Sequence, residues 1–415
     1  MTSEIKQRIE QIRRGEVPEG YVKTALGLAP ANWKRYTFGD IYTERKEPGD
    51  ENLPLLMVSI HSGVSDGEVD AAELPKQVKR IEDKSQYKKA VSGDLVFNMM
   101  RAWQGAIGTV RTTGMVSPAY IVAEPNDKVN PLFMDYYSRT PQMINQIDRQ
   151  SYGVTDFRKR LYWDSFAPIS CALPPIEEQQ KIAAILTTQD RVIELKEKCL
   201  AEKQRQKKYL MQQLLTGKKR LPGFNGAWKT DCLGKLFFER KETNCENIEM
   251  LAITGTQGII PRKELDLKDN SSEDKSKYLR VCVGDIGYNT MRMWQGVSAY
   301  SNYEGIVSPA YTILKPSSSI NAKYFAYLFK MSEIVFLFYR FSQGLVDDTR
   351  NLKYENFKKI KVCYPPDIKE QTAIAEVLSA ADREIELLQQ DIEQEKQKKK
   401  ALMQLLLTGI VRVKT

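Results

Sequence analysis

A short segment rich in side chains that can recognise nucleic-acid bases occurs twice in the 415-residue sequence. It comprises Met100–Gly105, with the sequence MRAWQG, and Met291–Gly296, with the sequence MRMWQG. Arg, Gln and Asn side chains can make paired hydrogen bonds to base edges, and aromatic rings can stack on bases. We call these segments the signature turns. Each is a candidate nucleic-acid contact, and a purely structural turn is the alternative.

The side chains around the signature turns divide between recognition and packing. We favour a core position for Trp103 and Trp294, and a phosphate or base contact for Arg101 and Arg292, because an Arg beside a glycine-containing turn is usually accessible. Neither role is favoured for the Gln and Asn residues. The candidate contacts are Arg101, Arg292, Gln104, Gln295, Asn98, Asn289, Tyr120, Tyr311, Ser62, Gln257, Lys159 and Arg350.

Two of these candidates come from segments that differ between the copies. The stretches 61–86 and 257–277 have different lengths and little shared sequence, whereas their borders align. Divergent loops on a common frame are where two related domains would carry different specificities. Ser62 and Gln257 are therefore candidate contacts, and drift of a surface loop is the alternative.

No motif in the sequence favours catalysis. The tetrads Ser117–Tyr120 and Ser308–Tyr311 resemble the loop that amino-methyltransferases place beside the target base, but an Ala replaces the second proline of that loop. No Gly-rich strand-turn-helix for a methyl donor precedes either copy. Glu44–Lys46 and Glu239–Lys241 supply only half of a nuclease motif, so we interpret them as surface charge. P-loop, zinc-protease and nucleophile-elbow motifs are also absent from the sequence.

The composition fits a globular chain with a weak preference for polyanions. The formal charge is +9 with a pI near 9.0, and 42% of the residues are hydrophobic. Basic surfaces attract phosphate, although many basic proteins bind no nucleic acid. The six cysteines form no C-x-x-C pair, and with His61 as the single histidine they suggest no zinc site. The N-terminus lacks an apolar signal core and no apolar run reaches membrane-spanning length, so we expect a cytoplasmic protein without a membrane partner.

The signature turns belong to a repeat that covers most of the chain. Residues 93–120 align without gaps on residues 284–311, with 14 of 28 positions identical by direct count. The offset of 191 positions continues to Phe166 and Phe357, and then becomes 192 in the segments that follow. Trp33 and Trp228 anchor the upstream ends. Two copies are too few for a solenoid, so we predict a pseudo-two-fold arrangement.

Each copy ends in a long helical pattern with a distinctive start and stop. The stretches Pro174–Gly217 and Pro365–Gly409 both begin with Pro-Pro, continue with Glu-Gln and end with Leu-Leu-Thr-Gly. Their apolar residues recur every seven positions, which lets two helices pack along their length. We predict an antiparallel intramolecular coiled coil of about 60 Å with one globular domain at each end. The seam candidates are Leu186, Ile193, Leu200 and Leu214, with Leu378, Ile385, Ile392 and Leu406.

Basic residues dilute the middle of both helices. The stretches Lys203–Lys208 and Lys396–Lys400 interrupt the apolar seam. We favour solvated helix faces as the explanation. The alternative is that these faces run near DNA or bind partner proteins.

The patterns together predict a mixed α/β (α+β) fold. Short apolar runs separated by turn residues predict a curved sheet in each globular segment, and 130–137 and 141–149 predict helices. Ile5, Ile9 and Ile12 predict a short amphipathic helix that packs near the end of the paired helices. The predicted ranges are 1–32 for the N-terminal helix and an irregular connector, 33–175 and 218–366 for the two domains, and 176–217 and 367–410 for the two long helices.

This order of elements resembles the DNA-specificity subunit of type I restriction-modification systems. The likeness covers Trp33–Gly409, and its most specific part is Leu173–Ile182, with the sequence LPPIEEQQKI. The second copy departs from the pattern by an extra residue before Glu370. The resemblance implies two target-recognition domains that each read one half of a split double-stranded DNA sequence, with the coiled coil as the ruler between them.

The resemblance also implies partner subunits. Two methyltransferase (modification) subunits would dock on the helices, and restriction subunits would join them for cleavage. S-adenosylmethionine and ATP would then bind to those partners, and this chain would need no cofactor or metal and carry no catalytic residue.

Two other functions remain open from the sequence. The chain could be a coiled-coil adaptor or architectural protein that binds other proteins, in which case its DNA affinity would be weak and insensitive to sequence. It could also be a self-contained DNA methyltransferase, in which case the isolated chain would bind S-adenosylmethionine.

Overall fold

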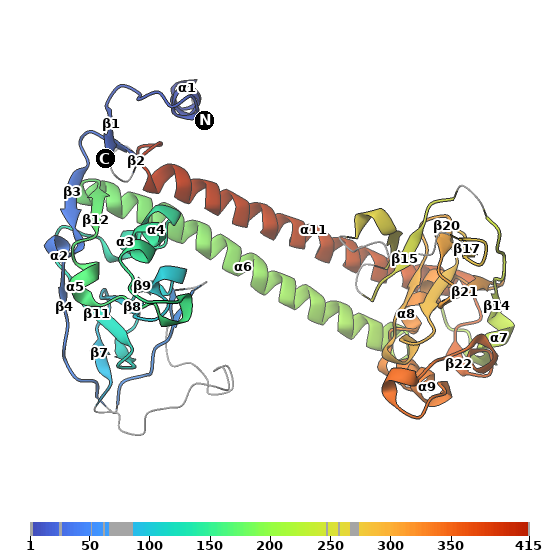
Figure 1. Cartoon of the computed structure of the whole chain (residues 1–415). Helices are drawn as coiled ribbons and strands as arrows, with labels where there is room; N and C mark the ends of the chain where they lie inside the picture. Colours follow the sequence, from blue (N-terminus) through green and yellow to red (C-terminus); the bar gives the residue numbers. More distant parts are fainter. Residues whose placement is uncertain are drawn as a thin grey trace. The chain divides into compact units, whose positions relative to one another are not determined.

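The chain forms two compact units, each built from a globular domain and parts of both long helices (Figure 1). The first unit comprises Met1–Lys196 and Asp391–Thr415, and the second comprises Glu197–Gln390. The boundary between the units therefore runs through the helices, whereas the predicted ranges separate helices from domains. The computed structural model describes residues 3–24, 27–50, 52–60, 63–65, 86–245, 248–255, 258–265 and 274–413.

A four-stranded antiparallel sheet is the frame of the first unit. Its strands lie in the order β4-β11-β8-β9, and Tyr120 of β11 pairs with Asn98 of β8. Smaller antiparallel pairs and short helices surround this sheet. The sheet strands are β4 (Tyr42–Glu44), β8 (Leu95–Asn98), β9 (Ile107–Thr109) and β11 (Tyr120–Pro125), and the pairs are β3 (Lys34–Thr37) with β12 (Ser170–Leu173), β5 (Val58–Ser59) with β6 (Gly63–Val64), and β7 (Lys88–Ala90) with β10 (Gly114–Val116).

Two helices of the first unit form where the sequence predicts them. α3 spans Pro131–Tyr137 and α4 spans Pro141–Arg149. The Asn130 side chain caps α3 by accepting a hydrogen bond from the Phe133 amide, and Thr140 caps α4 in the same way. A proline follows each cap at the first helical position, where no amide hydrogen is needed. The short helices α2 (Phe38–Ile41) and α5 (Trp163–Phe166) complete the domain.

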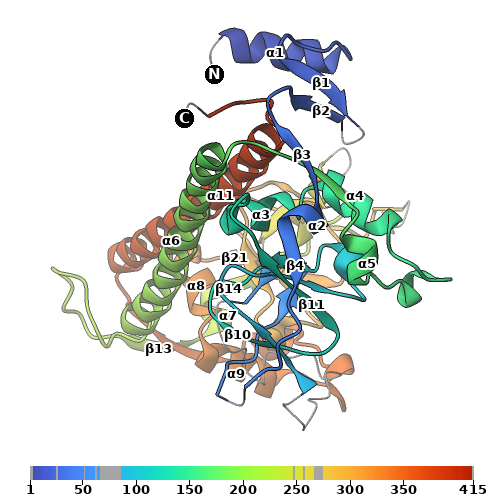
Figure 2. The ribbon, with the colours of Figure 1, turned by 90° about the vertical axis from the view of Figure 1, so that its left-hand side faces the viewer.

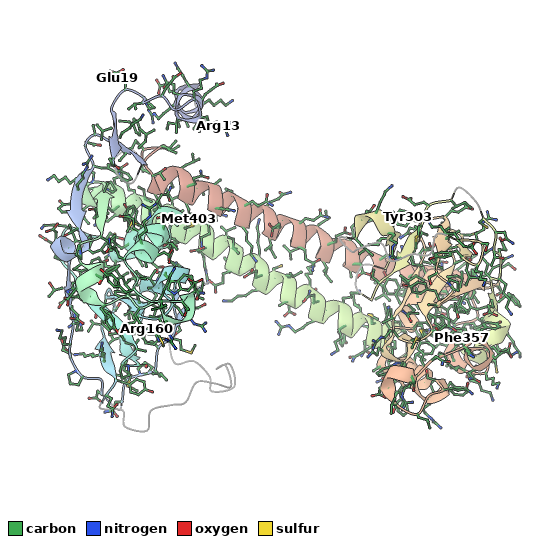
Figure 3. All side chains as sticks on the ribbon, in the orientation of Figure 1. Arg13, Glu19, Arg160, Tyr303, Phe357 and Met403 are labelled. Carbon is green, nitrogen blue, oxygen red and sulfur yellow. The ribbon has the colours of Figure 1, made fainter. Side chains whose placement is uncertain are left out.

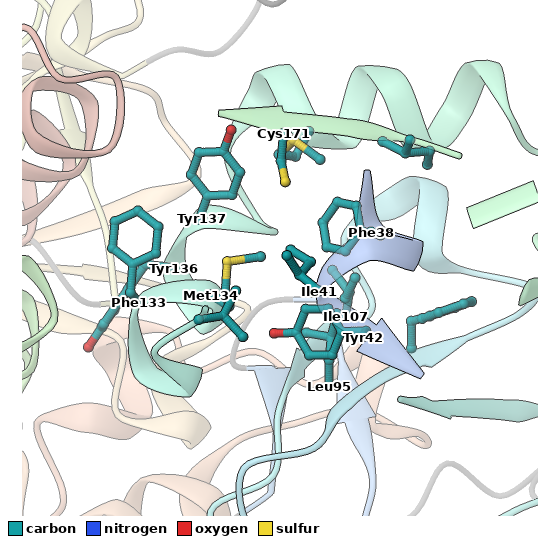
Figure 4. Packing of buried hydrophobic residues seen from close by; sticks show 14 of the residues in the cluster. Phe38, Ile41, Tyr42, Leu95, Ile107, Phe133, Met134, Tyr136, Tyr137 and Cys171 are labelled. Atoms are coloured by element: carbon teal, nitrogen blue, oxygen red, sulfur yellow. The ribbon is translucent and has the colours of Figure 1, made fainter. Parts of the chain in front are cut away.

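The hydrophobic core of the first unit joins the domain to the ends of the long helices. Figure 4 shows Phe38, Phe133 and Cys171 among the buried side chains at its centre. The same cluster includes Leu186 of α6 (Ile176–Leu214) and Leu406 of α11 (Ile368–Leu407). The helix ends are therefore part of the domain core, which explains why each unit contains them.

The second unit repeats the first, as the sequence predicts. Its main sheet has the order β14-β21-β18-β19, and Tyr311 pairs with Asn289 as Tyr120 pairs with Asn98. Its strands are β13 (Lys229–Cys232), β14 (Phe237–Glu239), β15 (Leu251–Ile253), β16 (Ile259–Pro261), β17 (Leu279–Val281), β18 (Ile286–Asn289), β19 (Ser298–Tyr300), β20 (Gly305–Val307), β21 (Tyr311–Pro316) and β22 (Lys361–Tyr364). Its helices outside the pair are α7 (Leu233–Leu236), α8 (Ala322–Leu328), α9 (Ser332–Phe341) and α10 (Tyr354–Phe357).

The long helices pair antiparallel within each unit. In the first unit Gln189 Nε2 donates to Glu395 Oε2 at 2.6 Å and Lys196 Nζ lies 2.8 Å from Asp391 Oδ2. In the second unit Lys203 Nζ lies 2.7 Å from Glu384 Oε2, and Lys207 pairs with Asp382. In each unit, later positions of α6 thus contact earlier positions of α11. The fold is accordingly the mixed α+β architecture with coiled-coil helices that the sequence predicts.

The apolar residues of the heptads face the interior of the pair. Leu186, Ile193, Leu214, Leu378, Ile392 and Leu406 are buried, and Leu200 and Ile385 are half-buried. Within the described part of the chain, no helix is both long and apolar enough to cross a membrane.

Lys203, Lys207 and Lys399 form ion pairs between the helices, whereas most other residues of these two basic stretches are exposed, as the interpretation of solvated faces predicts. Lys207 pairs with Asp382 in the second unit, and Lys399 Nζ lies 2.5 Å from Asp190 in the first. Tyr327 and Tyr136 donate hydrogen bonds of 2.6 Å to the same two aspartates. A charged residue in an apolar seam favours one register of a coiled coil. These matched Lys-Asp-Tyr groups therefore fix the register of the two helices within each unit.

The N-terminal connector is more regular than the sequence predicts. Residues after α1 (Ser3–Arg13) form an antiparallel pair, β1 (Tyr21–Thr24) and β2 (Gly27–Pro30), which the turn residues of this stretch did not suggest. The Tyr21 hydroxyl donates to the Gly409 carbonyl at 2.6 Å, and Arg8 donates to the Ile410 carbonyl at 3.1 Å. The predicted packing of this segment near a helix end is thereby confirmed (Figure 2).

Candidate nucleic-acid interface

The first signature turn presents two polar side chains on a rigid support. It begins after β8 and contains a short 3-10 helix, Ala102–Gln104. Asn98 Oδ1 accepts a hydrogen bond from the Met100 amide at 2.9 Å, and Trp103 Nε1 donates to the Met100 carbonyl at 3.0 Å. Ala102 is buried, and Arg101 and Gln104 are exposed.

The second signature turn has the same construction. Asn289 Oδ1 accepts from the Met291 amide at 2.9 Å, and Trp294 Nε1 donates to the Met291 carbonyl at 3.0 Å. The 3-10 helix here is Met293–Gln295, and Arg292 and Gln295 are exposed. The chain therefore builds the same pair of exposed side chains twice, once in each unit.

The two exposed arginines carry uncompensated positive charge. Among the residues that the structure describes, no hydrogen bond or ion pair holds the guanidinium of Arg101 or Arg292. An arginine guanidinium offers five donors in a fixed plane, which suits bidentate contacts to phosphate or to a guanine edge. The two turns thus combine free donors with a fixed backbone position.

Other sequence candidates support the turns. The side-chain carbonyls of Asn98 and Asn289 already hold the turn backbone, so their role in this structure is positional. Trp103 lies partly buried against the core, in line with the packing role that we favour. Tyr120 and Tyr311 are half-buried against the smaller hydrophobic clusters of their units.

Lys159 and Arg350 occupy equivalent positions of the repeat but contact different aromatic rings. Lys159 Nζ lies 4.8 Å from the centre of the Trp103 ring and 2.7 Å from Asp148 Oδ1. Hydrogen bonds to Asp148 and Asp156 raise the pKa of the Lys159 ammonium. The Arg350 guanidinium lies 4.0 Å from the centre of the Tyr339 ring. Both cations therefore brace the neighbourhood of the turn.

The divergent loops remain untested. Ser62 and Gln257, like His61, lie outside the residues that the structure describes. Of these stretches the structure describes β6, which pairs with β5, and β16, which pairs with β15. Their proposed part in specificity stays a prediction.

A buried ion pair fixes the strand that leads to each signature turn. Arg45 Nε lies 2.7 Å from Asp94 Oδ2, and Arg240 Nε lies 2.7 Å from Asp285 Oδ2. The arginine side chains are only 11% and 10% exposed. The interpretation of these arginines as surface charge is therefore wrong, because each pairs with an aspartate just before β8 or β18. The sequence signal for this ion pair is that the Arg and the Asp both occur in each copy of the repeat.

A second buried ion pair joins the start of one long helix to the end of the other. In the first unit Arg412 donates two hydrogen bonds of 2.7 Å to the Glu178 carboxylate. In the second unit Arg220 donates to Glu370 at 2.7 and 2.8 Å. Both glutamates belong to the Glu-Gln motif, and both arginines lie three residues after Leu-Leu-Thr-Gly. The start and stop motifs thus bind each other, and we call each contact a helix joint.

The glutamine of the same motif ties each helix to its domain. Gln179 Oε1 accepts from the Asn130 amide at 2.8 Å, and its Nε2 donates to the Pro174 carbonyl at 2.9 Å. Gln371 makes the matching bonds to the Asn321 amide and the Pro365 carbonyl. The motif therefore positions the helix on the domain and on the second helix at once.

Lys330 supports the signature turn of the second unit and predicts a pH effect. Its Nζ donates to the Gly296 carbonyl at 2.8 Å and to the Ser298 carbonyl at 2.6 Å. Desolvation lowers the pKa of Lys330 to about 8 from its usual 10.5. Between these pKa values the unfolded chain binds more protons, so stability should rise with pH.

We therefore expect the melting temperature of the wild type to rise relative to Lys330→Met between pH 7 and 9.5. Because the Lys330 side chain as a whole is exposed, solvent screening reduces the expected effect to about 1 kcal/mol, or roughly 2–4 °C. Lys330→Arg stays charged throughout and serves as the matched control. Parallel pH curves for wild type and Lys330→Met would contradict the prediction.

Comparison with protein families identifies the two units. The model of the type I restriction modification DNA specificity domain matches residues 65–205 and again residues 234–397. Each match contains one signature turn and the first part of the long helix that follows it. The two matches together cover more than half of the chain.

Similar proteins support the same relationship along the whole chain. The specificity subunit of the type I restriction enzyme MjaVIII from Methanocaldococcus jannaschii is 25% identical over 363 residues, covering 80% of this chain and 83% of the relative. A protein assigned as the MjaX specificity subunit of the same organism is 24% identical over 446 residues, covering 96% and 98%. The type I restriction-modification S subunit of M. genitalium has a similar fold, with a TM-score of 0.54, 12% identity, and coverage of 92% and 97%.

Proposed function

The chain belongs to the type I restriction modification DNA specificity family, and from this premise we propose that it is a non-catalytic subunit that reads a DNA target in two separated parts. The observation that carries the proposal is the signature turn, which is built identically in both units with an exposed Arg and Gln. Each unit would read one half of the target.

The turn suits recognition of base edges in duplex DNA. Arg and Gln side chains make bidentate contacts in the major groove, where every base pair presents a distinct pattern of donors and acceptors. The support from Asn98, Trp103 and their counterparts fixes the backbone, so little conformational entropy is lost on binding. Because each unit has its own turn and its own divergent loop, the two half-sites need not have the same sequence.

The long helices are the proposed seats for partner subunits. Apolar side chains remain exposed along them, including Leu195 and Tyr209 of α6 and Leu387 of α11. In the first unit a groove runs between the start of α3 and the face of α6 that carries Ala184 and Thr187. We propose that two modification subunits dock along the helices and that restriction subunits join them. S-adenosylmethionine and ATP would bind to those partners only.

The helix length should influence the gap between the half-sites. One heptad inserted into both helices, between 190 and 205 of α6 and at the facing position of α11, lengthens each by about 10 Å. It also preserves the seam. We expect the gap to grow by up to about three base pairs, because successive pairs are 3.4 Å apart.

The gap is measured by sequencing methylated DNA from cells that express the variant with its modification subunits. The matched control is an insertion of three residues, which turns the seam away from its partner and should abolish methylation. An unchanged gap in the heptad variant would exclude a ruler role for the helices.

Mapping methylated bases with the wild-type chain tests the proposed function itself. We expect a split recognition sequence with two specific parts. A single contiguous motif would contradict reading by two units. Binding of S-adenosylmethionine by the isolated chain would indicate a self-contained methyltransferase, and DNA binding without sequence preference would indicate an adaptor.

A further inference from the structure

A surface loop beside each signature turn carries a fully exposed apolar side chain. The loop of the first unit spans Ser151–Arg160, and that of the second spans Ser342–Asn351. We call them the tip loops. Val154 is 92% exposed and Leu345 is 100% exposed, at equivalent positions of the repeat. Single exposed apolar residues are common on protein surfaces, but here one recurs at the equivalent position of both copies.

The tip loops are rigid enough to present these side chains in a fixed place. Each is closed by an isolated bridge, with Tyr152 and Arg160 exchanging hydrogen bonds of 2.9 and 2.7 Å in the first unit. Gln343 and Asn351 exchange two bonds of 2.8 Å in the second. The bridge of the first unit ends at Arg160, which Figure 3 labels.

Close backbone packing adds to this rigidity. A Cβ atom on Gly153 would lie 2.5 Å from the Arg158 carbonyl carbon, and one on Gly344 would lie 2.6 Å from the Thr349 oxygen. Only glycine fits at either position, because the two sides of the loop touch there. Val154 and Leu345 directly follow these glycines, so the close backbone contact helps to fix the position of each exposed apolar residue.

The end of each tip loop is hydrogen-bonded to the residue that precedes its signature turn. The residue after the first loop, Leu161, donates to the Met99 carbonyl at 2.8 Å. Leu352 donates to the Thr290 carbonyl at 2.8 Å in the second unit. Lys159 of the first loop also lies over the Trp103 ring. The base of each tip loop therefore lies next to its signature turn.

The charges around the tips favour DNA as the occupant. Arg158 in the first tip loop and Lys353 beside the second are exposed, as are Arg101 and Arg292 in the turns. Asp156 of the first loop lies 3.2 Å from Lys159, and Asp347 of the second lies 2.8 Å from Arg350, while the second loop also contains Asp348. An apolar tip with exposed cations nearby matches a DNA groove, where phosphates flank apolar base surfaces.

We propose that Val154 and Leu345 are specificity-determining residues that insert into DNA beside the bases read by the signature turns, one in each half-site. This inference rests on the proposed function and adds an apolar contact to the polar ones. Removal of a Leu side chain from water contributes enough to change binding about tenfold or more when burial is complete. The smaller Val should contribute less.

The test uses the chain assembled with its modification subunits and duplexes that carry the mapped target. We expect Leu345→Asn to weaken binding of the intact target about tenfold, and Val154→Asn to weaken it severalfold. On a duplex whose corresponding half-site is scrambled, variant and wild type should bind equally. Leu345→Met keeps an apolar tip and should bind nearly as the wild type does. Val283→Asn removes an exposed apolar side chain from the turn between β17 and β18 and serves as the control.

Three outcomes would overturn the proposal. Unchanged affinity for the intact target would show that the tips do not touch DNA. An equal loss on all duplexes would show a contact without specificity. Unchanged DNA affinity with weaker binding of the modification subunits would assign the tips to a protein partner. Because the wild type must first distinguish intact from scrambled duplexes, failure of the proposed function would be visible separately.

Discussion

Replacement of Arg412 with Ala is expected to destabilise the first unit by about 3 kcal/mol, because the Glu178 carboxylate then stays buried without its partner. The Glu178 side chain is 1% exposed, and the Arg412 side chain is 31% exposed. Arg220→Ala should have the same effect in the second unit, where the Glu370 side chain is 2% exposed. Urea unfolding of the full chain measures both losses.

The matched control removes both charges, so that no unpaired charge stays buried. In the double variant Arg412→Met with Glu178→Leu, both partners become apolar and similar in size, so most of the loss should be recovered. Arg205→Ala removes an exposed charge from the middle of α6 and should change stability by less than about 0.5 kcal/mol. If Arg412→Ala were as stable as Arg205→Ala, the helix joint would not hold the unit together.

The second large effect concerns recognition. Arg101→Ala is expected to weaken binding to the intact target by roughly 10- to 100-fold, the equivalent of about 1–3 kcal/mol for a bidentate contact. The loss should be confined to the half-site read by the first unit. Arg292→Ala should behave in the same way at the other half-site. Fluorescence anisotropy with the intact target and with either half-site scrambled measures the two losses.

Lysine at the same positions distinguishes two kinds of contact. Arg101→Lys keeps the charge but loses the paired donors, so it should resemble Arg101→Ala if Arg101 reads a base. If it instead contacts a phosphate, Lys should restore binding. Ala would then weaken binding to every duplex and reduce the salt slope by about one. That result would leave the proposed specificity of the signature turns without support.

The repeat and the heptads made the fold predictable from the sequence. The structure follows local rules that the sequence shows. Asn130 and Thr140 cap helices that begin with proline, and the apolar residues of the heptads, such as Leu186 and Leu378, recur every seven positions as in paired helices. The frame of each sheet follows because the two copies share turn residues and apolar runs. Where the chemistry is local, a pattern of residues indicates the structure.

The contacts that organise the candidate site were harder to predict from the sequence. The joint between Glu178 and Arg412 connects residues that are 234 positions apart, and no local pattern indicates such a pair. The sequence left the role of Asn98 open, because residue type alone does not show that its side chain holds the turn backbone. The tip residues Val154 and Leu345 were missed since exposure depends on tertiary structure.

The bonds of Gln179 have a consequence for how such a protein changes over generations. Gln179 binds the main-chain amide of Asn130 and the main-chain carbonyls of Lys128 and Pro174, so its contacts do not depend on the side chains of the domain. Gln371 makes main-chain bonds of the same kind. Substitutions on the reading face therefore leave the attachment of the domain intact. A lineage that carries this chain is free to acquire a new DNA target by mutation or recombination within a domain, without having to rebuild its assembly at the same time.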